Sequence, residues 1–143
     1  VVLVSITLTS CYIPRLARMK RADYSTSLSR KKFKQSDKTN FDFYSIYVFS
    51  VVKDSVKQTK VYRFFPDGKV LIDEIESEKS ISMQEQLKSS SDNGYESSYR
   101  IHDDKIKIGE VERLNGKTFE SKFILKGDSL VKRSSQVVFQ KYH

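Results

Sequence analysis

The chain has 143 residues, of which 38% are hydrophobic and 31% charged, so it has the length of one domain and is too apolar to be disordered throughout. The single cysteine, Cys11, excludes an internal disulfide and a cysteine-based zinc site. The formal charge of +8 is uneven, because residues 12–38 hold nine Lys and Arg against two Asp, whereas residues 39–143 hold 17 basic and 16 acidic residues. This near neutrality argues against nucleic acid as a partner of the folded part.

The opening stretch, VVLVSITLTS (1–10), is uncharged and mostly apolar. It has the length of a signal-peptide core and is shorter than the roughly 20 residues that span a bilayer as a helix. We therefore expect a targeting segment. Its β-branched residues are also compatible with a strand, in which case Cys11 would be a buried structural cysteine.

Leu8, Thr9, Ser10 and Cys11 stand in an order that resembles the lipobox of bacterial lipoproteins, a Leu and two small residues before an invariant Cys. The resemblance implies that the Cys11 thiol is acylated, that the chain is cut before Cys11, and that the lipid holds the protein on a membrane. Tyr12 follows in place of the Asp that retains enterobacterial lipoproteins in the inner membrane. By resemblance, the expected location is the outer membrane, facing the periplasm.

Residues 12–38 are rich in Ser, Thr, Lys and Arg and lack sustained helical or strand periodicity. They are typical of a solvated linker between the anchor and the core. The alternative is that their positive charge contacts anionic lipid or cell wall.

The core begins with FDFYSIYVFSVV (41–52), which is apolar on both alternating faces and predicts a first, buried strand. Strands near 60–65 and 69–75 follow. Pro66, Asp67 and Gly68 supply the turn between them, since proline presets φ and glycine accepts positive φ.

Further along the chain, short strand-like runs are separated by turn candidates at 102–104, Asn115-Gly116 and Gly127-Asp128. In the run 118–126, alternation places Phe119, Phe123 and Leu125 on one face and Glu120, Lys122, Ile124 and Lys126 on the other. A last run, 136–142, is expected to pair back on the first strand.

The pattern predicts an all-β fold of seven or eight antiparallel strands, with one short helix or loop near 80–94. An up-and-down barrel is favoured because every predicted connection is a local hairpin, and a β-sandwich is the alternative. The FFPDGKV, YRIHDDKIKI and FILKGDSLV hairpins resemble those of small bacterial lipoproteins with lipocalin-like domains, common in Bacteroidetes. The expected organisation is a signal remnant (1–10), a lipidated cysteine with a basic linker (11–38) and a barrel domain (39–143).

The sequence lacks the common catalytic motifs, so we expect no enzyme and no cofactor. Glu74, Glu76 and Glu78 would share one strand face and could hold a cation or act as acid and base, but a charged edge strand explains them more simply. His102, Asp103 and Asp104 are better explained as turn formers than as metal ligands, and His143 carries no weight.

Tyr62, Arg63, Tyr99 and Arg100 are the polar candidates for a ligand site, because such side chains can point into a barrel and bind an anionic group. Adjacent strand residues point to opposite faces, so at most one of each pair can line the interior. The expected function is a binding module for a small apolar or amphipathic molecule. The alternative is an interaction protein whose filled barrel binds envelope proteins.

Overall fold

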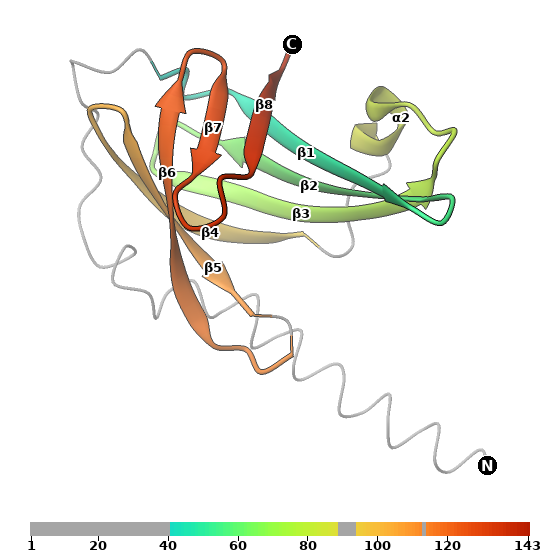
Figure 1. Ribbon diagram of the computed structural model, residues 1–143. Helices are drawn as coiled ribbons and strands as arrows, with labels where there is room; N and C mark the ends of the chain where they lie inside the picture. The colour runs from blue at the N-terminus through green and yellow to red at the C-terminus, as the bar shows by residue number, and fades with distance from the viewer. Residues whose placement is uncertain (1–40, 89–93, 113) are drawn as a thin grey trace.

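A computed structural model describes residues 41–88, 94–112 and 114–143 of the chain (Figure 1). Each strand pairs antiparallel with its sequence neighbours and β8 pairs with β1, so the sheet closes into an eight-stranded barrel. The predicted up-and-down barrel is confirmed, and the sandwich alternative is excluded. The elements are β1 (Ile46–Lys53), β2 (Val56–Phe64), β3 (Lys69–Glu78), α2 (Met83–Lys88), β4 (Tyr95–His102), β5 (Lys105–Val111), β6 (Thr118–Lys126), β7 (Ser129–Lys132) and β8 (Val138–Tyr142).

The predicted turns lie where glycine and aspartate indicated them. Gly68 between β2 and β3 has a φ of 87° and Gly116 between β5 and β6 a φ of 70°, conformations that are costly for residues with a Cβ. The predicted pairing of 136–142 with the first strand is also confirmed, since β8 pairs with the beginning of β1.

The first strand differs from its prediction at both ends. It begins at Ile46 rather than at residue 41, because the Asp42 carboxylate accepts a hydrogen bond from the Tyr44 amide (2.9 Å) and shapes a turn. It is followed at once by a two-residue hairpin turn at Asp54 and Ser55, whose φ angles are 51° and 68°. The second strand therefore begins at Val56, earlier than the predicted residue 60.

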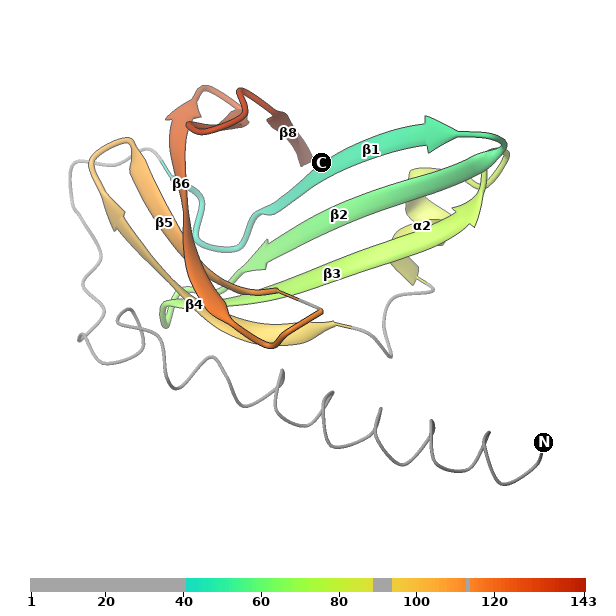
Figure 2. The same ribbon diagram turned by 60° about the horizontal axis from the view of Figure 1, so that its bottom comes forward.

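The first three strands are longer than the barrel they help to build. The β1–β2 ladder runs from Ile46 to Lys53, but β8 pairs only with Ile46, Tyr47 and Val48. Likewise β4 pairs with β3 only as far as Ile72. The remaining parts of the three strands (49–53, 56–60 and 73–78) form a sheet that continues beyond the barrel, here called the β1–β3 extension (Figure 2).

Helix α2 packs on the outer face of the β1–β3 extension through a buried glutamine. Gln86 accepts a hydrogen bond from the Thr59 hydroxyl (2.8 Å) and donates one to the Ser77 hydroxyl (2.6 Å). Lys57 donates to the Ile81 carbonyl (3.3 Å). The predicted helix or loop at 80–94 thus contains a short helix, and residues 89–93 lie outside the described part.

Candidate functional site

The interior of the barrel is filled by aromatic rings from the inward-facing positions of the strands. Tyr62 and Phe139 have ring centroids 4.9 Å apart, and Tyr62 and Phe123 are 5.6 Å apart. At one end, Phe41 lies edge-on to Phe64 at 5.0 Å and is 5% exposed, so it plugs the barrel. Close packing of this kind leaves no room for a ligand between these rings.

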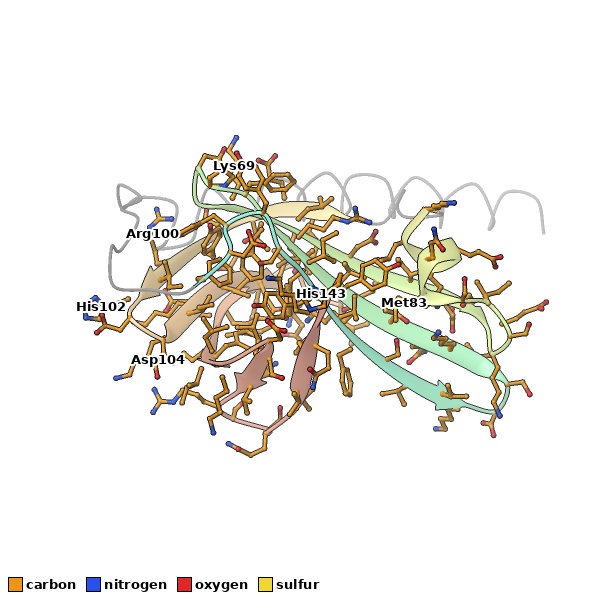
Figure 3. The ribbon with its side chains drawn as sticks, turned by 90° about the horizontal axis from the view of Figure 1, so that it is seen from above. Lys69, Met83, Arg100, His102, Asp104 and His143 are labelled. Carbon is orange, nitrogen blue, oxygen red and sulfur yellow. The ribbon has the colours of Figure 1, made fainter. Side chains whose placement is uncertain are left out.

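The sequence-predicted candidates separate by residue type, with both tyrosines inside and both arginines outside. The Tyr62 hydroxyl donates to Glu110 (3.0 Å) and the Tyr99 hydroxyl to the Phe65 carbonyl (2.7 Å). Arg63 donates to the Leu87 carbonyl (3.1 Å) at the end of α2, on the outer face. Arg100 also points away from the barrel (Figure 3) and donates to the Tyr99 carbonyl (2.6 Å). Neither guanidinium therefore lines the interior.

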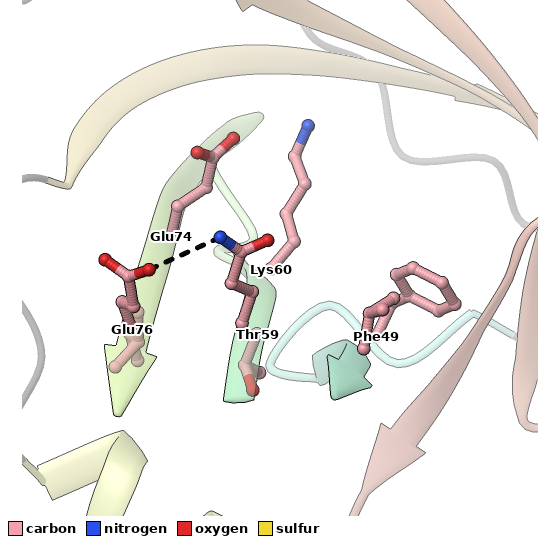
Figure 4. Close-up of a pocket in the computed structure, with 8 residues that line it drawn as sticks. Phe49, Thr59, Lys60, Glu74 and Glu76 are labelled. Carbon is pink, nitrogen blue, oxygen red and sulfur yellow. Dashed lines mark hydrogen bonds between the residues drawn. The ribbon is translucent and has the colours of Figure 1, made fainter. Parts of the chain in front are cut away.

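A cleft of about 340 Å³ opens at the other end of the barrel, on the concave face of the β1–β3 extension (Figure 4). We call it the mouth cleft. Phe49 and Val51 supply its apolar wall. Its polar side consists of Gln58, Lys60, Glu74 and Glu76.

Register explains why these side chains meet. Lys60 lies directly opposite Phe49 on one side and Glu74 on the other, and directly opposite residues in a sheet share a face. Gln58 is opposite Glu76, to which its amide donates at 3.4 Å. The three acidic residues predicted to share a strand face, Glu74, Glu76 and Glu78, do so, because β3 continues to Glu78.

The floor of the mouth cleft carries a buried ion pair. Glu110 of β5 is 1% exposed, and its carboxylate accepts hydrogen bonds from Lys60, Tyr62 and Ser121. Lys60 is 26% exposed, and its ammonium also lies 5.4 Å from the Tyr62 ring centroid. A charged pair held this way places a partly accessible cation at the base of an apolar wall.

Sequence reasoning missed Glu110, although a signal was available. In KIKIGEV (105–111) the apolar residues Ile106 and Ile108 alternate with lysines, so Glu110 continues the apolar set and must face the interior. A charge on an apolar strand face is rarely tolerated without a partner. That partner, Lys60, lies 50 residues earlier in the chain.

Burial raises the pKa of the interior tyrosines. Desolvation raises the pKa of Tyr47 to about 12. It also raises the pKa of Tyr99. For Tyr62, desolvation is again the main cause, and the nearby Glu110 carboxylate raises the pKa further. Each of these hydroxyls therefore ionises at a higher pH in the folded protein than in the unfolded chain.

The histidines lie at turns or at the chain end, on the surface. His102 is 3.6 Å from the Asp103 carboxylate in the β4–β5 turn, and its imidazole points away from the barrel (Figure 3). His143 lies 3.3 Å from the Asp128 carboxylate. Across the described ranges there is no group of three or more His, Cys, Asp or Glu placed to hold a metal ion.

The lipobox residues Leu8, Thr9, Ser10 and Cys11 and the basic linker (12–38) lie outside the described residues. Within the part of the chain that is described, no helix is long and apolar enough to cross a bilayer. Comparison with known proteins gave no match to a family model, to a curated protein or to a solved structure.

Proposed function

We propose that this protein is a non-catalytic binding module of the bacterial cell envelope, anchored by a lipid on Cys11, that binds a small amphipathic molecule in the mouth cleft. One observation carries the ligand proposal: Phe49 and Val51 adjoin the charged side chains of Lys60, Glu74 and Glu76 in a cleft at the open end of an otherwise filled barrel. Ligand sites combine apolar surface with a few placed polar groups in this way.

The proposed ligand lies across the mouth rather than along the barrel axis. Phe49 is part of both regions, since its ring is 5.5 Å from that of Phe139 in the core and it also lines the cleft. An apolar group of the ligand would cover Phe49 and Val51. Its polar group would meet Lys60 or the carboxylates beside it, with the Glu110 pair holding the ammonium in place.

The ligand proposal is tested by native mass spectrometry on the full chain carrying Cys11→Ser, purified gently and compared with a denatured sample. We expect an added mass that is lost on denaturation and is reduced in Phe49→Ser. Phe65→Ser is the control for loss of an accessible ring, because Phe65 is exposed and lies in the turn at the plugged end, whereas Phe49 is half-buried. Absence of an added mass, together with no binding of amphipathic dyes, would contradict the ligand proposal and favour a filled barrel that binds envelope proteins.

The anchor proposal has a separate test. Labelled fatty acid should be incorporated into the wild-type chain in a bacterial host and not into Cys11→Ser. The membrane fraction that holds the labelled protein then tests the proposed outer-membrane location. Equal labelling of both chains would overturn the anchor and leave the mouth cleft unaffected.

A further inference from the structure

A row of cations crosses the outer face of the barrel. Arg100 of β4 is directly opposite Lys107 of β5, which is directly opposite Lys122 of β6. The amide of Arg133, just after β7, donates to the Lys122 carbonyl (2.9 Å), so Arg133 continues the row. We call these four residues the basic row.

Alternation fixes the side of the barrel on which this row lies. The strand neighbours of Lys107 and Lys122, Ile108 and Phe123 among them, are buried in the interior. Side chains at alternate positions therefore point outward. The side chains of Lys107, Lys122 and Arg133 are exposed.

Placing like charges directly opposite one another costs stability in a sheet. Neighbouring strands lie about 4.8 Å apart, so the backbone brings adjacent members of the row close together. The outward positions of β5 and β6 add Lys105 and Lys126 and one acidic residue, Glu120, so this face carries more positive than negative charge. An anionic partner would offset this excess of positive charge.

Exposed apolar side chains lie on the same β5–β6 hairpin as Lys107 and Lys122. Leu114, at the tip of the β5–β6 hairpin, is 77% exposed, and Phe119, near the start of β6, is 44% exposed. Phe119 also lines a surface hollow whose charged residues are Glu120, Lys122, Lys132 and Arg133. The hairpin projects from the barrel in a different direction from the β1–β3 extension (Figure 1).

We propose that the basic row and the β5–β6 hairpin form a docking face for an anionic lipid bilayer, with headgroup phosphates against the row and Leu114 in the interfacial layer. Basic residues gain affinity from anionic headgroups, and apolar residues gain affinity from the acyl boundary beneath them. A nucleic acid or an acidic polysaccharide would satisfy the charges but offers no apolar phase for Leu114. This docking face uses residues outside the mouth cleft and does not depend on the lipid anchor.

The first test measures vesicle binding by the full chain carrying Cys11→Ser, so that no lipid anchor is attached. The variant Lys107→Gln/Lys122→Gln is compared with Lys53→Gln/Lys88→Gln, which removes the same charge from exposed positions at the tip of β1 and the end of α2. The basic segment 12–38 is unchanged in both. On vesicles of phosphatidylcholine with about 30% phosphatidylglycerol, we expect the first variant to bind about tenfold more weakly than the second. Equal binding by the two variants, or equal binding to neutral vesicles, would overturn the proposal.

The second test uses the absence of tryptophan from the sequence. Leu114→Trp places a single fluorophore at the hairpin tip, and Phe65→Trp is the control at the plugged end, where Phe65 is 42% exposed. Anionic vesicles should shift the Leu114→Trp emission to the blue and leave the Phe65→Trp emission unchanged. If Leu114→Trp shows no shift on vesicles that retain the protein, no insertion takes place and the bilayer proposal fails. Soluble heparin or DNA that competes fully in that case would identify a polyanion as the partner instead.

Discussion

The ion pair on the floor of the mouth cleft provides the sharpest quantitative prediction. Lys60→Met removes the ammonium and keeps most of the side-chain volume. Glu110 then retains its bonds from Tyr62 and Ser121 but loses its counter-charge while remaining 1% exposed. Breaking a buried pair costs about 3–5 kcal/mol. Because Lys60 is 26% exposed and water lies close, we expect the lower end, about 3 kcal/mol.

The reciprocal change should cost less. Glu110→Gln keeps the shape and the hydrogen-bonding capacity of the carboxylate, and Lys60 can turn toward solvent, so we expect a loss of about 1–2 kcal/mol. In Lys60→Met/Glu110→Gln neither charge is left buried without a partner, and the total loss should be about 2 kcal/mol. The two changes would then couple by about 2 kcal/mol or more, within the range measured for residues in one network.

Urea denaturation of the full chain at neutral pH, followed by circular dichroism, measures all four free energies of unfolding. The dependence of the free energy on urea should be the same in the four chains, because the surface exposed on unfolding hardly changes. Losses that add to within about 0.5 kcal/mol would show that the pair is not coupled and refute the reasoning. A loss below about 1 kcal/mol for Lys60→Met would show that water already solvates Glu110.

Three further predictions concern the barrel itself. Ser55→Gly should raise the free energy of unfolding by about 1 kcal/mol, because Ser55 has a φ of 68° in a two-residue hairpin turn that favours glycine. Urea denaturation of the variant and the wild type measures this, and a lower free energy of unfolding in the variant would contradict it. Phe139→Ala should cost about 3–5 kcal/mol, since the ring is 3% exposed and contacts Phe49, Tyr62 and Phe123; Val138→Ala, at an exposed neighbouring position, should cost far less. The pKa values of Tyr47, Tyr62 and Tyr99 are raised by burial, so the unfolded chain loses these protons first as pH rises. The free energy of unfolding should therefore be constant below about pH 9 and fall above about pH 10, by up to about 1.4 kcal/mol per pH unit for each tyrosine. A urea midpoint that stays constant to about pH 11 would show that these hydroxyls ionise equally in the folded and unfolded states.

The barrel could be predicted from the sequence because its signals are local. Alternating runs and turns such as the one at Gly68 specify hairpins one at a time, and successive hairpins make a meander. The β1–β2 hairpin was missed because its turn, Asp54 and Ser55, contains no glycine even though both residues adopt positive φ. The pairing of β8 with β1 ends at Val48, so the rest of β1 continues into the β1–β3 extension. No local signal in the sequence predicts this end point, because it depends on the register of all the strands around the barrel.

The mouth cleft could be predicted only in part. Alternation alone decides that one member of each Tyr-Arg pair faces inward. The inward residue is the tyrosine because a buried guanidinium would need a charged or hydrogen-bonding partner inside the barrel to offset its desolvation. The interior holds one such partner already, the Glu110 carboxylate, and this accepts bonds from Lys60 and Tyr62. The contact between Lys60 and Glu110 joins β2 to β5 across the barrel, so neither strand sequence predicts it alone.

Net charge alone does not describe how charges are placed on the surface. Residues 39–143 carry 17 basic and 16 acidic residues, and this balance argues against nucleic acid as a partner of the folded part. Register instead decides where like charges gather: Glu74, Glu76 and Glu78 share the concave face of the β1–β3 extension with Lys60, whereas Lys107 and Lys122 lie side by side on the outer face of β5 and β6. An anionic surface would attract the face that carries these lysines even though the domain as a whole is nearly neutral. The basic row lies on the outer face of β4 to β6 and the mouth cleft on the concave face of the β1–β3 extension, so the two proposals rest on different residues and each can fail without the other.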